Sequence, residues 1–140
     1  LPLCTLVTPN IPEAEVLTGY SISNKEDMIK AARKILNMGS KNVLLKGGHL
    51  KNKMIFDILA TKKEIKIFKK RKIKTKNTHG TGCTFASALA VSLAEEIDLF
   101  EAVSKAKSFV QLSIRKAYSV GSGKGPVDHF HNLIDYNNRT

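Results

Sequence analysis

The segment with the strongest chemical character is residues 77–84, which read Asn-Thr-His-Gly-Thr-Gly-Cys-Thr. Gly80 and Gly82 let the backbone turn tightly and expose its N–H groups. A helix is predicted to start directly after them, so free N–H groups and the positive end of the helix dipole converge on one point and form an anion site. Cys83 falls in the first turn of that helix, where a thiolate is stabilised. A proton acceptor beside an anion site is what phosphoryl transfer requires.

The same spacing also fits a purely structural interpretation. Residues 77–84 could be a glycine-rich turn that opens a packed helix, with Cys83 as a small buried apolar residue. The spacing leaves both interpretations open. A Walker A loop is excluded, because no Gly-Lys-Ser/Thr follows the glycines. A zinc site built on Cys83 and His79 is excluded as well, because two further ligands at metal-like spacing are missing.

A second candidate lies in residues 8–15, Thr-Pro-Asn-Ile-Pro-Glu-Ala-Glu. Asn10 and Glu13 are three residues apart at a predicted helix start, so their side chains can face one point. They follow a predicted strand, and ligands of parallel sheets bind beyond the carboxyl ends of strands. An amide oxygen and a carboxylate there could organise Mg²⁺ through water. From the residues alone, helix capping by Asn10 and Glu13 is the favoured alternative.

Two further segments carry polar groups at the ends of predicted elements. Lys46 precedes Gly47 and Gly48 at a strand end, where it could neutralise a phosphate, or simply be an exposed lysine beside a turn. Asp128, His129 and His131 lie in a polar stretch over residues 126–131. They could suggest a metal site, although a polar turn explains them more simply.

Helices and strands alternate along the chain and must position these groups. Hydrophobic periodicity predicts strands over 3–8, 42–46, 54–60 and 64–73, and helices over 12–18, 23–38, 81–95 and 100–118. The strands over 54–60 and 64–73 could form a hairpin. Ser23 and Glu26 are predicted to form a capping box for the second helix. Cys4 is expected to be core filling in the first strand. Strands separated by helices predict an α/β domain with a largely parallel sheet.

Composition restricts the function classes further. The 140 residues carry 42% hydrophobic side chains and a formal charge of +11, which suits one globular domain with a real core. No apolar run approaches the roughly 18 residues of a membrane span, and two cysteines are compatible with a reducing cytoplasm. The excess of positive charge lies in residues 62–76, where Phe68 is the only aromatic residue. Nucleic-acid binding is disfavoured, because a binding groove would add aromatic side chains for stacking. A solvated basic edge, or a field that attracts a polyphosphate, fits better.

Four segments at 8–15, 44–49, 77–84 and 123–130 follow one another in a specific order. Together they resemble the C-terminal half of the hydroxymethylpyrimidine/phosphomethylpyrimidine kinase family, a thiamin-biosynthesis family of the ribokinase-like superfamily. The resemblance covers essentially the whole chain. It implies an α/β fold, namely the C-terminal half of a ribokinase-like doubly wound sheet with flanking helices. Residues 1–140 would form a single domain, the ATP-binding and catalytic part, with the N-terminal half absent.

The resemblance also implies the activity and the roles of individual residues. The activity would be ATP- and Mg²⁺-dependent phosphorylation of 4-amino-5-hydroxymethyl-2-methylpyrimidine and then of its monophosphate. Cys83 matches the catalytic base. The N–H groups of Gly80, Thr81, Gly82 and Cys83 would form the anion hole, and His79 would lie near the substrate.

Residues of the earlier segments receive roles in the same way. Lys46 would hold the charge of the ATP phosphates, and Asn10 and Glu13 match the element that organises Mg²⁺ and phosphate. Many superfamily members carry Asp where Cys83 stands. A cysteine there points to the pyrimidine kinases or to the related Cys-type pyridoxal kinases, and a thiol is a workable base.

Three further expectations follow from the resemblance. Pyridoxal kinase of the same fold is the alternative activity, and a non-catalytic remnant or one half of a split enzyme is the alternative of another class. In the split form, a complementary N-terminal chain would be a partner, and relatives suggest a homodimer. The protein is expected to be cytoplasmic and to bind neither membrane nor nucleic acid.

Overall fold

The computed structural model describes residues 1–48 and 54–131, so His49 of the third predicted motif lies outside the described residues. The chain divides into two compact units, Leu1–Lys72 and Ile73–Thr140. We describe each unit by itself. The single domain expected over residues 1–140 stays a prediction.

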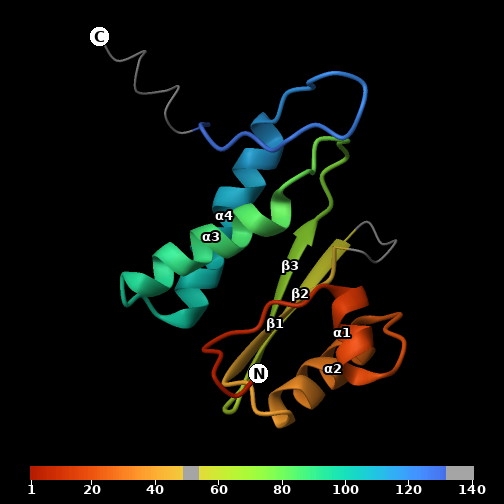
Figure 1. Cartoon of the computed structure of the whole chain (residues 1–140), viewed down its shortest axis with the longest axis vertical. Coiled ribbons are helices and arrows are strands. Elements are labelled where there is room, and N and C mark those ends of the chain that lie inside the picture. The colour runs from red at the N-terminus through yellow and green to blue at the C-terminus, as the bar shows by residue number, and fades with distance from the viewer. Residues whose placement is uncertain (49–53, 132–140) are drawn as a thin grey trace. The chain divides into compact units, whose positions relative to one another are not determined.

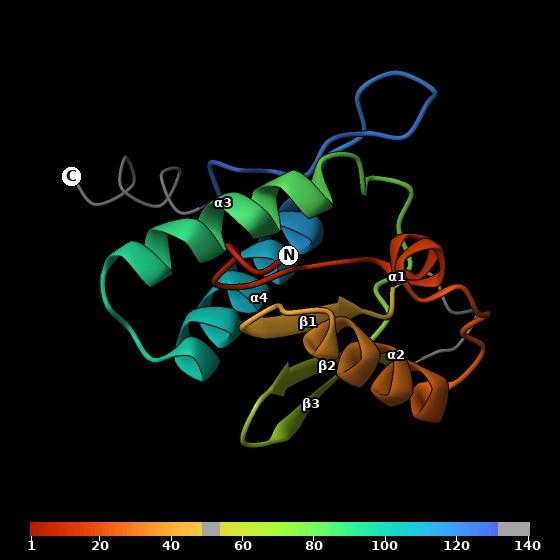
Figure 2. The same ribbon diagram turned by 60° about the horizontal axis from the view of Figure 1, so that its bottom comes forward.

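The first unit is a small sheet with two helices on one face (Figures 1 and 2). Its elements are α1 (Ile11–Thr18), α2 (Lys25–Asn37), β1 (Asn42–Lys46), β2 (Met54–Thr61) and β3 (Ile65–Arg71). The strand order is β1-β2-β3. Both pairings are antiparallel, and the register sets Lys46 opposite Asp57 and Ile58 opposite Ile67.

The antiparallel pairing confirms the hairpin considered for 54–60 and 64–73, but corrects the prediction of a largely parallel sheet. Only residues 62–64 separate β2 from β3, and a parallel crossover needs a dozen residues or more. The loop between β1 and β2 is also shorter than a crossover. Among the described residues of this unit, parallel pairing is confined to two isolated bridges, Val7 with Val43 and Asn10 with Lys46.

The predicted strand over residues 3–8 is also wrong. Val7 forms one bridge beside β1, but Leu3 is 97% exposed and Cys4 is exposed rather than core filling. Proline explains part of the difference, because Pro9 lacks an N–H group and cannot extend a hydrogen-bond ladder. The segment therefore runs beside β1 without becoming a regular strand.

The apolar face of α2 builds the core of this unit. Met28, Ala31, Ala32 and Ile35 recur at helical spacing and are fully buried. They pack in one cluster with β1 and β2 side chains that point to the same face: Val43, Leu45, Ile58 and Ala60. This packing fixes β1, and with it the position of Lys46 at the end of the strand.

The start of α2 differs from the predicted capping box. The N-cap is Asn24, whose side chain accepts a hydrogen bond from the Asp27 N–H at 2.9 Å. Ser23 lies one residue outside, and its hydroxyl donates to Asp27 at 2.8 Å. Asn is as good an N-cap as Ser, so the helix begins one residue later than predicted. The Glu26 side chain does not accept the reciprocal hydrogen bond that a capping box with Ser23 requires.

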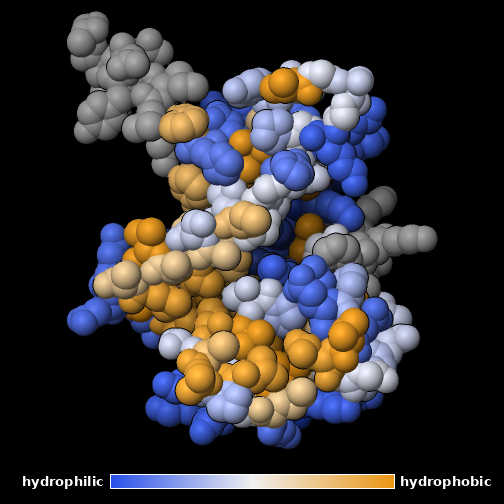
Figure 3. Space-filling view, viewed as in Figure 1, coloured by the Kyte–Doolittle hydropathy of each residue, from blue (hydrophilic) through white to orange (hydrophobic). Residues whose placement is uncertain are grey.

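The second unit contains two packed helices, α3 (Thr81–Ala94) and α4 (Leu99–Lys116). Both were predicted to within two residues at each end. Phe85 and Leu89 of α3 are buried, as are Ala102, Val103, Ala106 and Val110 of α4. The surface over α3 remains partly apolar (Figure 3), and Val91 is 60% exposed.

The basic stretch at 62–76 contains β3, the edge strand of the sheet. Lys66 pairs with Glu64 at 3.1 Å, and Ile67 is 44% exposed. The expected half-exposed strand is confirmed, but its exposed side differs from the prediction: Ile67 is exposed with Lys69 and Arg71, whereas Lys66 and Lys70 are half-buried. Among the described residues, no helix is long and apolar enough to cross a membrane.

Candidate active site

The first unit brings together three of the predicted site residues at the end of β1. The Lys46 N–H donates to the Pro9 carbonyl at 2.8 Å, and Asn10 pairs in parallel with Lys46. Asn10 is the N-cap of α1, so the start of that helix lies beside the end of the strand. Lys46, Asn10 and Glu13 thus belong to one edge of this unit.

Asn10 and Glu13 cap α1 reciprocally. The Asn10 side-chain oxygen accepts from the Glu13 N–H at 2.9 Å, and Glu13 Oε2 accepts from the Asn10 N–H at 2.8 Å. The capping interpretation is therefore confirmed. Within the described ranges, Glu13 Oε1 and Asn10 Nδ2 carry no hydrogen bond, so capping leaves one carboxylate oxygen available.

Gly47 must be glycine because the chain passes close to β2. A Cβ atom there would run into the carbonyl oxygen of Phe56. The Gly47 N–H donates to Asp57 Oδ1 at 2.8 Å, and Asp57 is buried opposite Lys46. The sequence interpretation missed Asp57, although a lone carboxylate inside the apolar run of β2 was a signal for it. Its role is to hold the turn that follows Lys46.

The second unit presents the loop 77–84 and the start of α3. Gly80 is the N-cap in the left-handed conformation, with φ of 84°, which glycine adopts without strain. No described side chain caps this helix, and its first turn contains no acidic residue. Within residues 1–48 and 54–131, the N–H groups of Gly80, Gly82 and Cys83 have no partner, whereas the Thr81 N–H points at the Thr78 carbonyl at 3.3 Å. Unpaired donors without a nearby acid form an anion site.

Cys83 lies in the first turn of α3 and is exposed. The alternative of a small buried core residue is therefore wrong. An accessible thiol beside unpaired N–H groups can take a proton from a bound alcohol while the N–H groups bind the anion. His79 lies directly before Gly80, the N-cap of α3, and its backbone forms a parallel bridge with Pro126.

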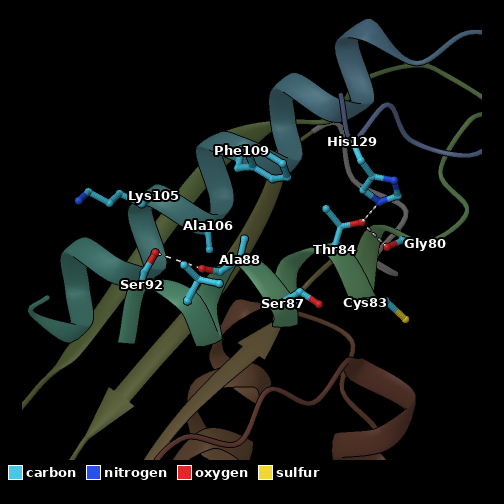
Figure 4. Close-up of a pocket in the computed structure, with 11 residues that line it drawn as sticks. Gly80, Cys83, Thr84, Ser87, Ala88, Ser92, Lys105, Ala106, Phe109 and His129 are labelled. Atoms are coloured by element: carbon cyan, nitrogen blue, oxygen red, sulfur yellow. Dashed lines mark hydrogen bonds between the residues drawn. The ribbon is translucent and has the colours of Figure 1, made fainter. Parts of the chain in front are cut away.

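A pocket of about 640 Å³ extends from this anion site along α3 and α4 (Figure 4). Gly80, Cys83, Thr84 and His129 lie at one end of it. The remaining wall is mostly apolar and is formed by Ser87, Ala88, Val91, Ser92, Lys105, Ala106 and Phe109. All these residues belong to the second unit.

The sequence assigns His129 to a polar turn or, as the alternative, to a metal site with Asp128 and His131. In the structure its Nε2 lies 2.7 Å from the Thr84 hydroxyl (Figure 4). This long-range contact had no local signal in the sequence. No group of three or more metal-ligating side chains occurs among the described residues, so a metal site at His129 and His131 finds no support.

Comparison with known proteins agrees with this geometry. The Phosphomethylpyrimidine kinase family model matches residues 1–128. The chain is 48% identical over 132 residues to the hydroxymethylpyrimidine/phosphomethylpyrimidine kinase of Staphylococcus aureus (strain MRSA252), covering 93% of this chain and 48% of the relative. It is 50% identical over 138 residues to the thiamine biosynthesis bifunctional protein ThiED of Geobacter sulfurreducens, covering 99% of this chain and 28% of that protein.

A solved structure shows the same fold. The ADP complex of Bacillus subtilis pyridoxal kinase matches with a TM-score of 0.88 and 34% identity, covering 95% of this chain and 51% of that one. The expected ribokinase-like α/β fold is thereby confirmed. This chain spans about half the length of the kinases it matches. With a family model that matches nearly all of its residues, the chain belongs to the phosphomethylpyrimidine kinase family.

Proposed function

We propose that the protein transfers the γ-phosphoryl group of ATP to 4-amino-5-hydroxymethyl-2-methylpyrimidine and then to its monophosphate. The observation that carries the proposal is the exposed thiol of Cys83 in the first turn of a helix whose N–H groups at Gly82 and Cys83 are unpaired within the described residues. The relative at 48% identity is named a hydroxymethylpyrimidine/phosphomethylpyrimidine kinase, and the relative at 50% identity is named a thiamine biosynthesis bifunctional protein. Both names support the pyrimidine as substrate. Since the chain spans about half of such a kinase, the activity as a whole is part of the proposal.

Cys83 and the start of α3 would divide the chemistry between them. The Cys83 thiolate takes the proton of the substrate hydroxyl as that oxygen attacks the γ-phosphorus of ATP, and the bond from the γ-phosphorus to the bridging oxygen breaks to release ADP. The N–H groups of Gly80, Thr81, Gly82 and Cys83 hold the charge that spreads over the transferred group. Of these four, Thr81 must first give up its contact with the Thr78 carbonyl. His79 would lie beside the substrate.

The first unit would supply the positive charge for the nucleotide. The Lys46 ammonium neutralises phosphate oxygens, with Asn10 beside it. The donor set fits Mg²⁺ held mainly by water and phosphate, because this ion is commonly bound through one or two carboxylates and Glu13 Oε1 is available. When bound, Mg²⁺ neutralises charge on the phosphates.

The partners in this proposal are small molecules. The ADP complex of a pyridoxal kinase with the same fold supports a nucleotide as one of them. A homodimer, a complementary N-terminal chain and a cytoplasmic location, where ATP is available, belong to the same proposal.

Pyridoxal phosphorylation is the second candidate, favoured by the pyridoxal kinase structure. The decisive experiment supplies the protein with ATP, Mg²⁺ and equal concentrations of the pyrimidine alcohol and pyridoxal, and identifies the phosphorylated product by mass spectrometry. The proposal predicts the pyrimidine phosphate and then its diphosphate. Pyridoxal phosphate as the main product would support the second candidate, and nucleotide binding without any product would support the non-catalytic alternative.

A further inference from the structure

The segment Gly125 to His129 contacts both ends of the loop that carries the candidate anion site. Near the first end of the loop, the His79 N–H donates to the Gly125 carbonyl at 3.1 Å, and the Val127 N–H donates to the His79 carbonyl at 3.3 Å. Gly125 fits here only because it has no side chain, since a Cβ atom would run into the amide of Asn77. The sequence motif at 123–130 therefore has a structural partner, the loop 77–84.

At the other end of the loop the contact depends on one side chain. His129 Nε2 lies 2.7 Å from Thr84 Oγ1, and Thr84 Oγ1 lies 2.8 Å from the Gly80 carbonyl. A hydroxyl has one hydrogen, and a carbonyl has none. Both contacts are satisfied together only if Thr84 donates to Gly80 and His129 donates through Nε2–H. The three groups then form a chain of two hydrogen bonds that runs from His129 through Thr84 to Gly80, the N-cap.

The N-cap at the end of this chain sets the direction of the anion-binding groups. Gly80 has no side chain with which to cap α3 and sits in the left-handed conformation. Its peptide is held within the helix by the Thr84 N–H at 2.9 Å and by the Thr84 hydroxyl. Rotation of this peptide would redirect the N–H groups of Thr81 and Gly82, which follow it directly.

We propose that His129 is a positioning residue for phosphoryl transfer, which acts through Thr84 and Gly80 to hold the N–H groups of residues 80–83 in their anion-binding arrangement. This inference rests on the proposed function. His129 is exposed, and its contact with Thr84 is partly buried. Its replacement should therefore loosen the loop without unfolding the unit, and the charge on the imidazole is not required.

The test measures anion binding rather than turnover. Inorganic phosphate is titrated into ¹⁵N-labelled protein, and the amide signals of Gly80, Gly82 and Cys83 report the dissociation constant. His129→Ala and Thr84→Val each break the chain, whereas His129→Gln keeps an N–H donor in a similar place. Ser104→Ala is the matched control, because its hydroxyl donates to the Phe100 carbonyl four residues earlier on α4, at 2.9 Å, and has no hydrogen bond to a histidine among the described residues.

We expect His129→Ala and Thr84→Val to weaken phosphate binding by about three- to tenfold, the range of one hydrogen bond. His129→Gln should restore binding to within about twofold, and Ser104→Ala should not change it. Melting temperatures measured in parallel separate loop positioning from loss of stability. Equal binding by wild type, His129→Ala and Thr84→Val would overturn the inference and leave the anion site intact. If phosphate does not shift the amide signals of the wild-type protein, the proposed function is overturned, and the inference with it.

Discussion

Asn10 and Lys46 lie in parallel register at the point where β1 ends and α1 begins. The pairing places a lysine ammonium, an amide and the Glu13 carboxylate on one edge of the first unit. We expect Lys46→Met to weaken ATP binding by about tenfold or more, because one charge-assisted contact to phosphate is lost. Isothermal titration calorimetry measures the affinity. Lys41→Met, exposed just ahead of β1, is the control, and equal affinities of the two variants would contradict the role of Lys46.

Capping and metal binding by Glu13 can be separated by substitution. Glu13→Gln keeps a side-chain oxygen for the Asn10 N–H but removes the charge that would attract Mg²⁺. The variant should fold normally, and the Mg²⁺ concentration that supports half-maximal ATP binding should rise several-fold. Glu26→Gln, in the first turn of α2, should leave that concentration unchanged. A Mg²⁺ requirement unaffected by Glu13→Gln would leave this residue with capping alone.

Asn10→Ala tests the cap itself. Loss of the bond from the Glu13 N–H at 2.9 Å should lower the free energy of unfolding by about 1 kcal/mol. Urea unfolding followed by circular dichroism measures the loss. A free energy equal to that of wild type would show that the capping bond adds nothing to stability.

Gly47 and Gly48 should respond very differently to the same substitution. A Cβ atom at Gly47 would clash with the Phe56 backbone, whereas one at Gly48 meets no atom within 4 Å. We expect Gly47→Ala to destabilise the protein by about 3 kcal/mol. Gly48→Ala should stay within about 0.5 kcal/mol of wild type. Thermal unfolding of the pair provides the comparison, and similar melting temperatures would disprove the close approach.

Asp27 should make the stability of the first unit depend on pH. The Ser23 N–H, the Ser23 hydroxyl, the positive charge of Lys30 and the Asn24 backbone N–H lower the pKa of Asp27 below its ordinary value of 3.8. A lowered pKa means that the stabilisation is complete above pH 3.8 and is lost as the pH falls through the folded-state pKa. Asp27→Asn should therefore be less stable than wild type at neutral pH and equally stable in strong acid. If the free energies of unfolding of wild type and Asp27→Asn differ by the same amount at every pH, this assignment is contradicted.

Short-range signals allowed much of the fold and the site to be predicted. The helices α2, α3 and α4 follow from their apolar spacing, and the glycines of residues 77–84 predicted the unpaired helix start. The short connection between the strands over 54–60 and 64–73 indicated a hairpin there, but the antiparallel pairing of β1 with β2 was not predictable from alternation alone. Antiparallel and parallel strands share the same pattern over a few residues. The choice of Asn24 over Ser23 as N-cap was equally open, since both residue types cap well.

Contacts between distant residues account for what the sequence did not reveal. Asp57 and His129 act on Gly47 and Thr84, each through one hydrogen bond across the fold. Neither bond has a local pattern, because it forms only after the chain has folded. The exposure of Cys83 was likewise undecided, since a cysteine near a helix start suits a core as well as a site.

The most direct test of the account compares the wild-type protein with Cys83→Ala, supplied with ATP, Mg²⁺ and the pyrimidine alcohol. ADP formation is followed together with ATP affinity, and Cys4→Ala, which removes the other exposed thiol, is the control. We expect Cys83→Ala to lose about 100-fold or more of the turnover, with ATP affinity close to that of wild type, and Cys4→Ala to be fully active. Turnover by Cys83→Ala at the wild-type rate would contradict the assignment of Cys83 as the base.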